Sequence, residues 1–189
     1  MNKRVHQTAK HEISRRRILR HSALGVVGLL ATPNLVLANT TQAKMLAFHN
    51  LHTGESLKAA FWENGAPVKT GLQEINEILR DFRTGEMIDM DINLMHLLHK
   101  LRNRVHSRQP FNVISGYRSP ATNAKLREKS NGVAKKSFHM RGMAIDISLQ
   151  GCDLHELHDA ARELHLGGVG YYPKSGFIHV DTGRPRYWS

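Results

Sequence analysis

Cysteine is nearly absent from this chain of 189 residues, and long hydrophobic runs are missing too. The single cysteine, Cys152, excludes an intramolecular disulfide framework and cannot form the kind of structural zinc site that recruits several cysteines. The main apolar stretch, residues 22–38, is too short and too rich in small residues to be a convincing membrane span. Internal repeats and low-complexity segments are also absent. With 40% apolar residues, the chain is typical of one compact domain plus a short appendage.

Residues 1–38 have the layout of a cleavable signal peptide, in which a basic stretch precedes the apolar run. Within them, SRRRILR at 14–20 is in register with the twin-arginine export signal, although an arginine-rich ordinary secretory signal is the alternative. We therefore expect a twin-arginine-type signal peptide at 1–38 and a folded domain at 39–189. This predicts passage through the twin-arginine machinery to the periplasm, with no stable membrane span after cleavage.

Acidic residues are scarce, because 16 Asp and Glu accompany 27 Lys and Arg for a formal net charge of +11. Such an excess suggests an anionic partner such as nucleic acid. However, seven of the basic residues and only one acidic residue lie in the predicted signal peptide. Export would also separate the domain from the cell's nucleic acid, and no motif of interleaved basic and aromatic residues appears. We therefore expect no nucleic-acid partner.

Helices and strands are predicted to alternate in the domain without a regular β-α-β rhythm, which indicates the α+β class. Turn residues and apolar alternation predict the strands, at 44–50, 56–62, 111–115, 143–149, 169–172 and 177–181. Apolar spacing and capping residues predict the helices, at 72–82, 91–105, 120–129 and 153–165.

Ten of the 13 histidines lie after residue 38, which at first sight suggests a metal-rich protein. No HExxH motif accompanies those on the predicted helices, so solvent-exposed side chains are the favoured interpretation there. These histidines are His96, His99, His106, His155, His158 and His165. His49 and His52 flank the predicted hairpin turn and belong to no motif either.

Three other ionisable residues, His139, Asp146 and His179, lie on or next to predicted strands. Asp146 alternates with two isoleucines, and an ionised carboxylate among apolar strand residues is costly unless a positive charge compensates it. A metal ion shared with the two imidazoles is one compensation, and Arg118 is another. Two imidazole nitrogens and one carboxylate oxygen are the usual ligands of a catalytic zinc ion.

Three motif blocks, in order, resemble a known family. SFHMRGMAID at 137–146 matches the pattern SxHxxGxAxD, SGYRS at 115–119 is similar to a substrate-side motif, and GGVGYYPKSGFIHVDTG at 167–183 is similar to a closing block. Together they resemble the zinc peptidases related to D-alanyl-D-alanine carboxypeptidases and to the hedgehog signalling domain. The twin-arginine leader and LHTGESLKA at 51–59 make the resemblance closest to the murein endopeptidases of that family.

The resemblance implies a small antiparallel sheet that carries one zinc ion, with helices packed around it. It implies that His139, Asp146 and His179 bind this ion. Arg118 would lie beside it and hold a substrate carboxylate or the developing oxyanion, which a fixed guanidinium does well. Gly142 would allow a tight turn beneath the metal.

The remaining site residues keep two interpretations each. Ser137 either contacts substrate or hydrogen-bonds its own loop. Tyr117, like Tyr171 and Tyr172, either lines the substrate groove or packs in the core. Asp181 lies two residues after His179 on the same face of a predicted strand, so it either activates the metal-bound water or orients that histidine.

Many relatives place a glutamate three residues before the last zinc histidine, where this chain has Gly176. Others place a histidine two residues before it, where this chain has Phe177. The resemblance implies hydrolysis of peptidoglycan cross-link peptides, at meso-diaminopimelate–meso-diaminopimelate or D-Ala–meso-diaminopimelate bonds. Because the usual base is missing, a non-catalytic zinc domain that binds wall peptides is the alternative.

Overall fold

The computed structural model describes residues 43–130 and 132–189, so the predicted signal peptide lies outside the described residues. The strands are β1 (Lys44–Asn50), β2 (Ser56–Glu63), β3 (Ala66–Pro67), β4 (Phe111–Ser115), β5 (Ala144–Leu149), β6 (Gly168–Tyr172), β7 (Phe177–Asp181) and β8 (Arg186–Trp188). The α-helices are α1 (Lys69–Ile78), α2 (Ile92–Arg104), α3 (Pro120–Lys129) and α4 (Leu154–Glu163). Short 3-10 helices are η1 (Phe138–Arg141) and η2 (Pro173–Ser175). None of the helices in the described ranges is long and apolar enough to cross a membrane.

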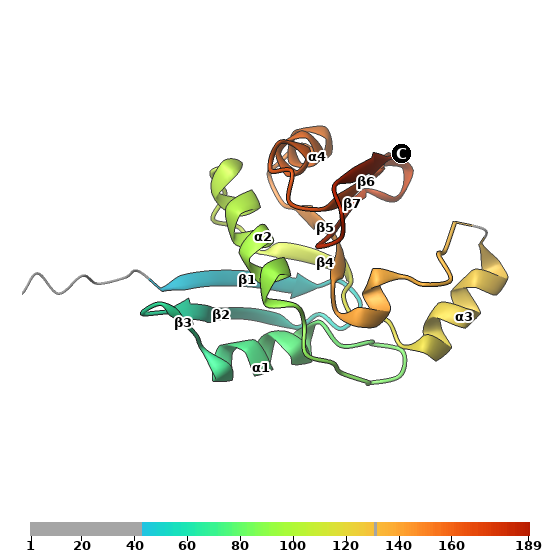
Figure 1. Ribbon diagram of the computed structural model, residues 1–189, viewed down its shortest axis with the longest axis horizontal. Helices are drawn as coiled ribbons and strands as arrows, with labels where there is room; N and C mark the ends of the chain where they lie inside the picture. Colours follow the sequence, from blue (N-terminus) through green and yellow to red (C-terminus); the bar gives the residue numbers. More distant parts are fainter. Residues whose placement is uncertain (1–42, 131) are drawn as a thin grey trace, which may run out of the picture. The chain divides into compact units, whose positions relative to one another are not determined.

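One mixed sheet contains all of these strands, in the order β3-β2-β1-β4-β5-β7-β6-β8 (Figure 1). Neighbouring strands are antiparallel except β1–β4 and β6–β8, which are parallel. The α+β class is therefore confirmed. The sheet is larger than the small antiparallel one that was expected, because the hairpin β1–β2 joins it at one side and β8 joins it at the other.

The core lies between the sheet and three helices, where α1 packs on β2, α2 on β1, and α4 on β5, β6 and β7. Phe48, Phe61 and Phe111 are fully buried there, and burying one such side chain contributes about 1.5–3 kcal/mol. An ion pair between Arg104 and Glu163 connects α2 with α4. By contrast, α3 and the segment that follows it lie beside the sheet (Figure 1).

Helix α1 ends at Ile78, four residues before the end that the apolar spacing predicts. Asp81 gives the reason, because its buried carboxylate accepts hydrogen bonds from the backbone N–H groups of Arg83 (3.0 Å) and Ser119 (2.9 Å). The chain has to leave the helix and turn to make these bonds. Since Ser119 directly follows Arg118, Asp81 ties the end of α1 to the segment that carries the predicted substrate-binding arginine.

The prediction that the helix histidines are solvent-exposed is wrong for His158, which is only 9% exposed and whose ring centroid lies 4.7 Å from that of Tyr171. His96 is half-buried, with its ring edge-on to Phe61 and Trp62. Burial lowers the pKa of both histidines. They are therefore packing residues and were misassigned because strands β2 and β6 cover these helix faces.

Replacing Asp81 by alanine is expected to lower the free energy of unfolding by about 2–4 kcal/mol, because two backbone N–H groups lose their buried acceptor. Burial opposes ionisation of Asp81, but hydrogen bonds from Thr122, Ser119 and Arg83 outweigh it and lower its pKa. The carboxylate's contribution should therefore be complete above about pH 4 and fall as the pH drops through the folded-state pKa.

Urea denaturation at pH 7 and pH 3 measures this effect. Glu74→Ala, at an exposed position of α1, is the matched control and should change stability by no more than about 0.5 kcal/mol. A difference between wild type and Asp81→Ala that is equally large at both pH values would contradict the assignment.

Candidate metal centre and active site

The three predicted metal ligands lie together in the structure. His139 Nε2 is 3.2 Å from His179 Nδ1 and 3.2 Å from Asp146 Oδ1, and His179 Nδ1 is 2.9 Å from Asp146 Oδ1. Asp146 on β5 and His179 on β7 are directly opposite each other in the antiparallel ladder. Strand register therefore fixes two of the side chains, and η1 supplies the third.

The separations suit a metal ion. Ligand atoms of a tetrahedral zinc ion, at bond lengths of about 2.0–2.1 Å, lie about 3.3 Å from each other. Within the part of the chain that the structure describes, these residues form the only group of three or more His, Cys, Asp or Glu with ligand atoms close enough to share an ion. The residues present therefore fit the three-ligand zinc site that the sequence predicts.

The ring nitrogen of each imidazole that points away from the other two ligands also has a hydrogen-bond acceptor. His139 Nδ1 donates to the backbone carbonyl of Gly116 at 2.8 Å, and His179 Nε2 donates to Asp181 Oδ2 at 2.9 Å. These bonds favour the tautomers that carry the proton on the outer nitrogen. The inner nitrogens, His139 Nε2 and His179 Nδ1, then keep a free lone pair for a metal ion.

Asp181 is completely buried, and both of its oxygens are occupied. Oδ1 accepts from the backbone N–H groups of Gly168 (3.2 Å) and Gly183 (2.8 Å), and Arg186 binds both oxygens. Burial alone would raise the pKa of Asp181, but the hydrogen bonds from His179 and Arg186 hold it well below its ordinary value. Asp181 is therefore an ionised carboxylate next to the ligand cluster, which consists of His139, Asp146 and His179.

Asp146 has beside it Arg118, one of the two compensations that the sequence left open, and the two imidazoles that would share a metal ion with it. Arg118 Nη2 lies 3.5 Å from Asp146 Oδ2, while the two imidazoles lie on the other oxygen. Burial opposes ionisation, yet His139 and His179 lower the pKa of Asp146 far below its usual range. The same carboxylate and Asp181 raise the pKa of His179 against the effect of burial.

Arg118 is largely buried but incompletely satisfied. Its Nη2 makes a long hydrogen bond of 3.3 Å to Ser115 Oγ, and its Nε has no hydrogen-bond partner among the described residues. Burial is the main cause that lowers the pKa of Arg118, and Asp146 opposes it. A guanidinium that lines a cavity and makes only long contacts through one Nη group can bind an anionic group of a ligand with its Nη groups.

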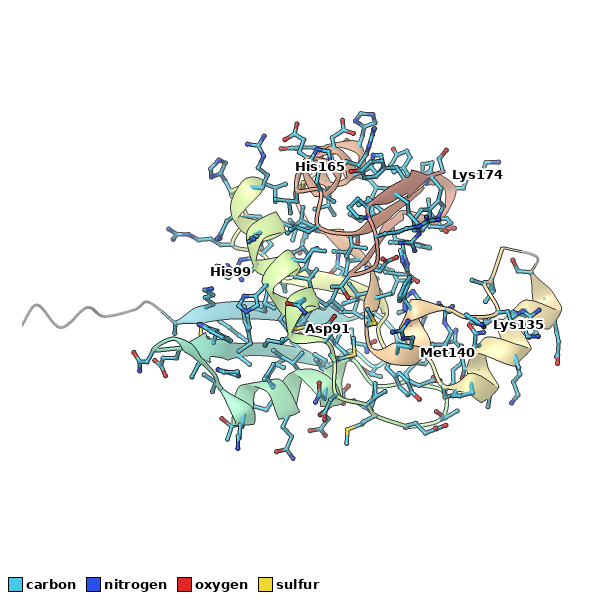
Figure 2. The ribbon with its side chains drawn as sticks, viewed as in Figure 1. Asp91, His99, Lys135, Met140, His165 and Lys174 are labelled. Carbon is cyan, nitrogen blue, oxygen red and sulfur yellow. The ribbon has the colours of Figure 1, made fainter. Side chains whose placement is uncertain are left out.

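A cavity of about 570 Å³ opens over the cluster. The segment between α3 and η1, on which Figure 2 labels Lys135, supplies several of its lining residues, and the turn between β6 and β7, on which Figure 2 labels Lys174, supplies Ser175. Asp146 is the one acidic residue among its described lining residues. The lining consists of Arg118, Ser130, Gly132, Val133, Ala134, Lys136, Ser137, Phe138, His139, Asp146, Tyr172, Ser175, Phe177, His179, Arg186 and Trp188.

Ser137 and Tyr117 lie in different places. Ser137 lines the cavity, and its Oγ accepts from the backbone N–H of His139 at 3.3 Å, which caps η1. Tyr117 packs against the core and is not among the cavity's lining residues, whereas Tyr172 is. Gly142 ends η1 with φ +66°, the left-handed conformation that the predicted tight turn requires.

Arg186 and Trp188 were missed from the sequence, although both line the cavity. Their strand, β8, has only three residues, too few for a periodic pattern to indicate. The alternation of two large side chains around Tyr187 is the only signal that the sequence offers.

Comparison with known proteins supplies relatives along almost the whole chain. A family model described as "Peptidoglycan L,D-endopeptidase MepK" matches residues 38–188. The curated peptidoglycan L,D-endopeptidase MepK of Escherichia coli strain K12 is 41% identical over 183 residues, covering 95% of this chain and 99% of the relative. The probable peptidoglycan L,D-endopeptidase MepK of Haemophilus influenzae is 41% identical over 165 residues, covering 86% and 89%.

Proposed function

Because the chain belongs to the peptidoglycan L,D-endopeptidase MepK family, we propose that it is a zinc-dependent endopeptidase that hydrolyses peptide cross-links of peptidoglycan. The observation that carries this proposal is the convergence of His139, Asp146 and His179 beside Arg118 at a cavity. The proposed scissile bonds are meso-diaminopimelate–meso-diaminopimelate, D-Ala–meso-diaminopimelate, or both.

A zinc ion held by His139, Asp146 and His179 would lower the pKa of a bound water and polarise the scissile carbonyl. Arg118 would bind the negative charge of the substrate, either a carboxylate next to the scissile bond or the oxyanion that develops on it. Its place in the cavity lining and its fixed position beside Asp146 support this role. Ser137, which lines the same cavity, is the proposed substrate contact on the η1 side, and Tyr117 is assigned to packing.

For Asp181, we infer that it orients His179 and does not act as the general base. Its burial, its five hydrogen bonds and its absence from the cavity lining support this inference. A carboxylate with no access to the cavity cannot take a proton from a water molecule there. It can hold the outer proton of His179 in place.

A non-catalytic domain that binds wall peptides is the second candidate. One observation favours it: apart from the ligand Asp146, no acidic side chain lines the described cavity to act as a base. The two candidates share the fold and the ligand residues, so only turnover separates them.

Digestion of purified peptidoglycan by the zinc-loaded protein should reduce the cross-linked dimers and raise the monomers, and a chelator should abolish this change. Muropeptide chromatography measures both species. His179→Ala should abolish digestion, whereas His155→Ala, an exposed histidine on α4, should digest as the wild type does. Unchanged dimers with a fully zinc-loaded protein would exclude the enzyme and leave the binding domain.

Asp181→Asn tests the orienting role. Loss of this support for a metal-bound histidine is expected to weaken zinc binding by about 10–100-fold, and excess zinc should restore turnover. Competition against a chromophoric chelator gives the affinity. A variant that binds zinc as tightly as the wild type but no longer turns over would instead identify Asp181 as the base.

We also propose that the protein is exported to the periplasm through the twin-arginine route, on the basis of SRRRILR at 14–20. Replacing Arg15 and Arg16 by lysine should leave the precursor in the cytoplasm. Cell fractionation and immunoblotting of the precursor and the mature chain measure the distribution. Normal export of the lysine variant would point to an ordinary secretory signal.

A further inference from the structure

Strand β8 contributes two side chains to the site. It runs parallel to β6 with Arg186 opposite Gly168 and Trp188 opposite Gly170. Arg186 and Trp188 line the cavity, whereas Tyr187 between them is 40% exposed. Successive side chains of a strand point to opposite faces. Arg186 and Trp188 therefore face the cavity, and Tyr187 faces away from it.

Arg186 is linked to the ligand cluster through one intermediate residue, Asp181. Its Nη1 donates to Asp181 Oδ1 at 3.0 Å and its Nη2 to Asp181 Oδ2 at 2.7 Å, a bidentate pairing with a fully buried carboxylate. Asp181 Oδ2 in turn accepts from His179 Nε2. A Cβ at Gly168 would lie 2.3 Å from Arg186 Nη1, so the absence of a side chain there makes room for the guanidinium.

Trp188 contacts the cluster and the cavity wall together. Its ring centroid lies 5.3 Å from that of His179, and its Nε1 donates to the Tyr172 hydroxyl at 2.8 Å. Tyr172 is also stacked on Phe177, with 4.8 Å between ring centroids. Gly170 leaves the space for the indole, because a Cβ there would lie 2.5 Å from it.

The indole of Trp188 therefore fixes the position of the Tyr172 hydroxyl, and the hydroxyl proton stays available for another hydrogen bond. Its oxygen accepts the indole N–H, and a phenol keeps its own O–H as a donor. No acceptor for this proton is recorded among the described residues, and the side chain lines the cavity that contains Arg118 and the cluster. A prepositioned donor of this kind stabilises negative charge that develops on a bound carbonyl.

We propose that β8 is part of the active site. Arg186 is a positioning residue that holds the metal ligand His179 through Asp181. Trp188 is a positioning residue for Tyr172, whose hydroxyl donates a hydrogen bond to the oxygen of the scissile carbonyl and is thus a further catalytic group. This inference rests on the proposed function, which supplies the substrate.

The Arg186 link is tested by zinc affinity. Arg186→Met should weaken zinc binding about tenfold or more. Arg186→Lys, which keeps the charge but not the bidentate fork, should recover part of the loss. Tyr187→Phe is the matched control on the same strand: it loses the hydrogen bonds to His165 and to the Arg162 carbonyl and should bind zinc as the wild type does.

NMR of the metal-free protein gives a second readout, because the Nε2–H proton of His179, which Asp181 holds, should exchange slowly with solvent in wild type and faster in Arg186→Met. Wild-type zinc affinity and an unchanged exchange rate of this proton in Arg186→Met would overturn this link. If that variant fails to fold, Arg186→Lys decides, since it should still bind zinc less tightly than Tyr187→Phe.

The Trp188 link is tested by a double-mutant cycle. Tyr172→Phe and Trp188→Phe should each lower kcat about tenfold, the loss of about one hydrogen bond, with KM and zinc affinity nearly unchanged. The double variant should lose no more than Tyr172→Phe alone, because Trp188 acts through that hydroxyl. Wild-type kcat in Tyr172→Phe, or losses that multiply in the double variant, would overturn it.

Failure of this inference is distinguishable from failure of the proposed function. If the wild type binds zinc and cleaves cross-links but the β8 variants match it, only the role of β8 is lost. If the wild type neither binds zinc nor cleaves, the proposed function itself fails.

Discussion

The site depends on the pairing of β5 with β7, which places Asp146 directly opposite His179. Side chains alternate between the two faces of a strand, so a shift of register by one residue would move one of the pair to the wrong face and replace it with an apolar neighbour. Ile145 and Ile147 anchor β5 in the core, and Ile178 and Val180 anchor β7, so hydrophobic burial fixes the register that brings the two ligands together. The apolar core thus determines the polar site.

A chain of charged side chains, joined through the imidazole of His179, runs through this part of the sheet. Arg118, Asp146, His179, Asp181 and Arg186 follow one another through contacts of 2.7–3.5 Å. An unpaired buried charge is expensive, whereas a carboxylate with partners on both oxygens stays ionised. Each member therefore fixes the orientation of the next, and the imidazole of His179 is held between two carboxylates with little freedom to rotate.

Features determined by local sequence could be predicted. The helix 120–129 and the strand 111–115 were found to the residue, since capping residues and apolar patterns mark them, and the family expected from the motif blocks is confirmed. The end of α1, the burial of His158 and the strand β8 were missed because each depends on tertiary contacts that no local sequence pattern marks. Asp81 bonds to Ser119, His158 packs on Tyr171, and Arg186 pairs with Asp181 across a turn that no periodicity reveals.

The charge balance of this buried chain has a consequence for ligand preference. Two arginines and two aspartates cancel, and the imidazoles of a metal-binding site are neutral. The protein scaffold around the cluster is therefore electroneutral, and the full double charge of a divalent ion would remain uncompensated within the cavity. Lys136 on the cavity wall adds a further positive charge. A zinc-loaded site of this kind would favour anions, hydroxide over water and carboxylate-bearing peptides over neutral ones.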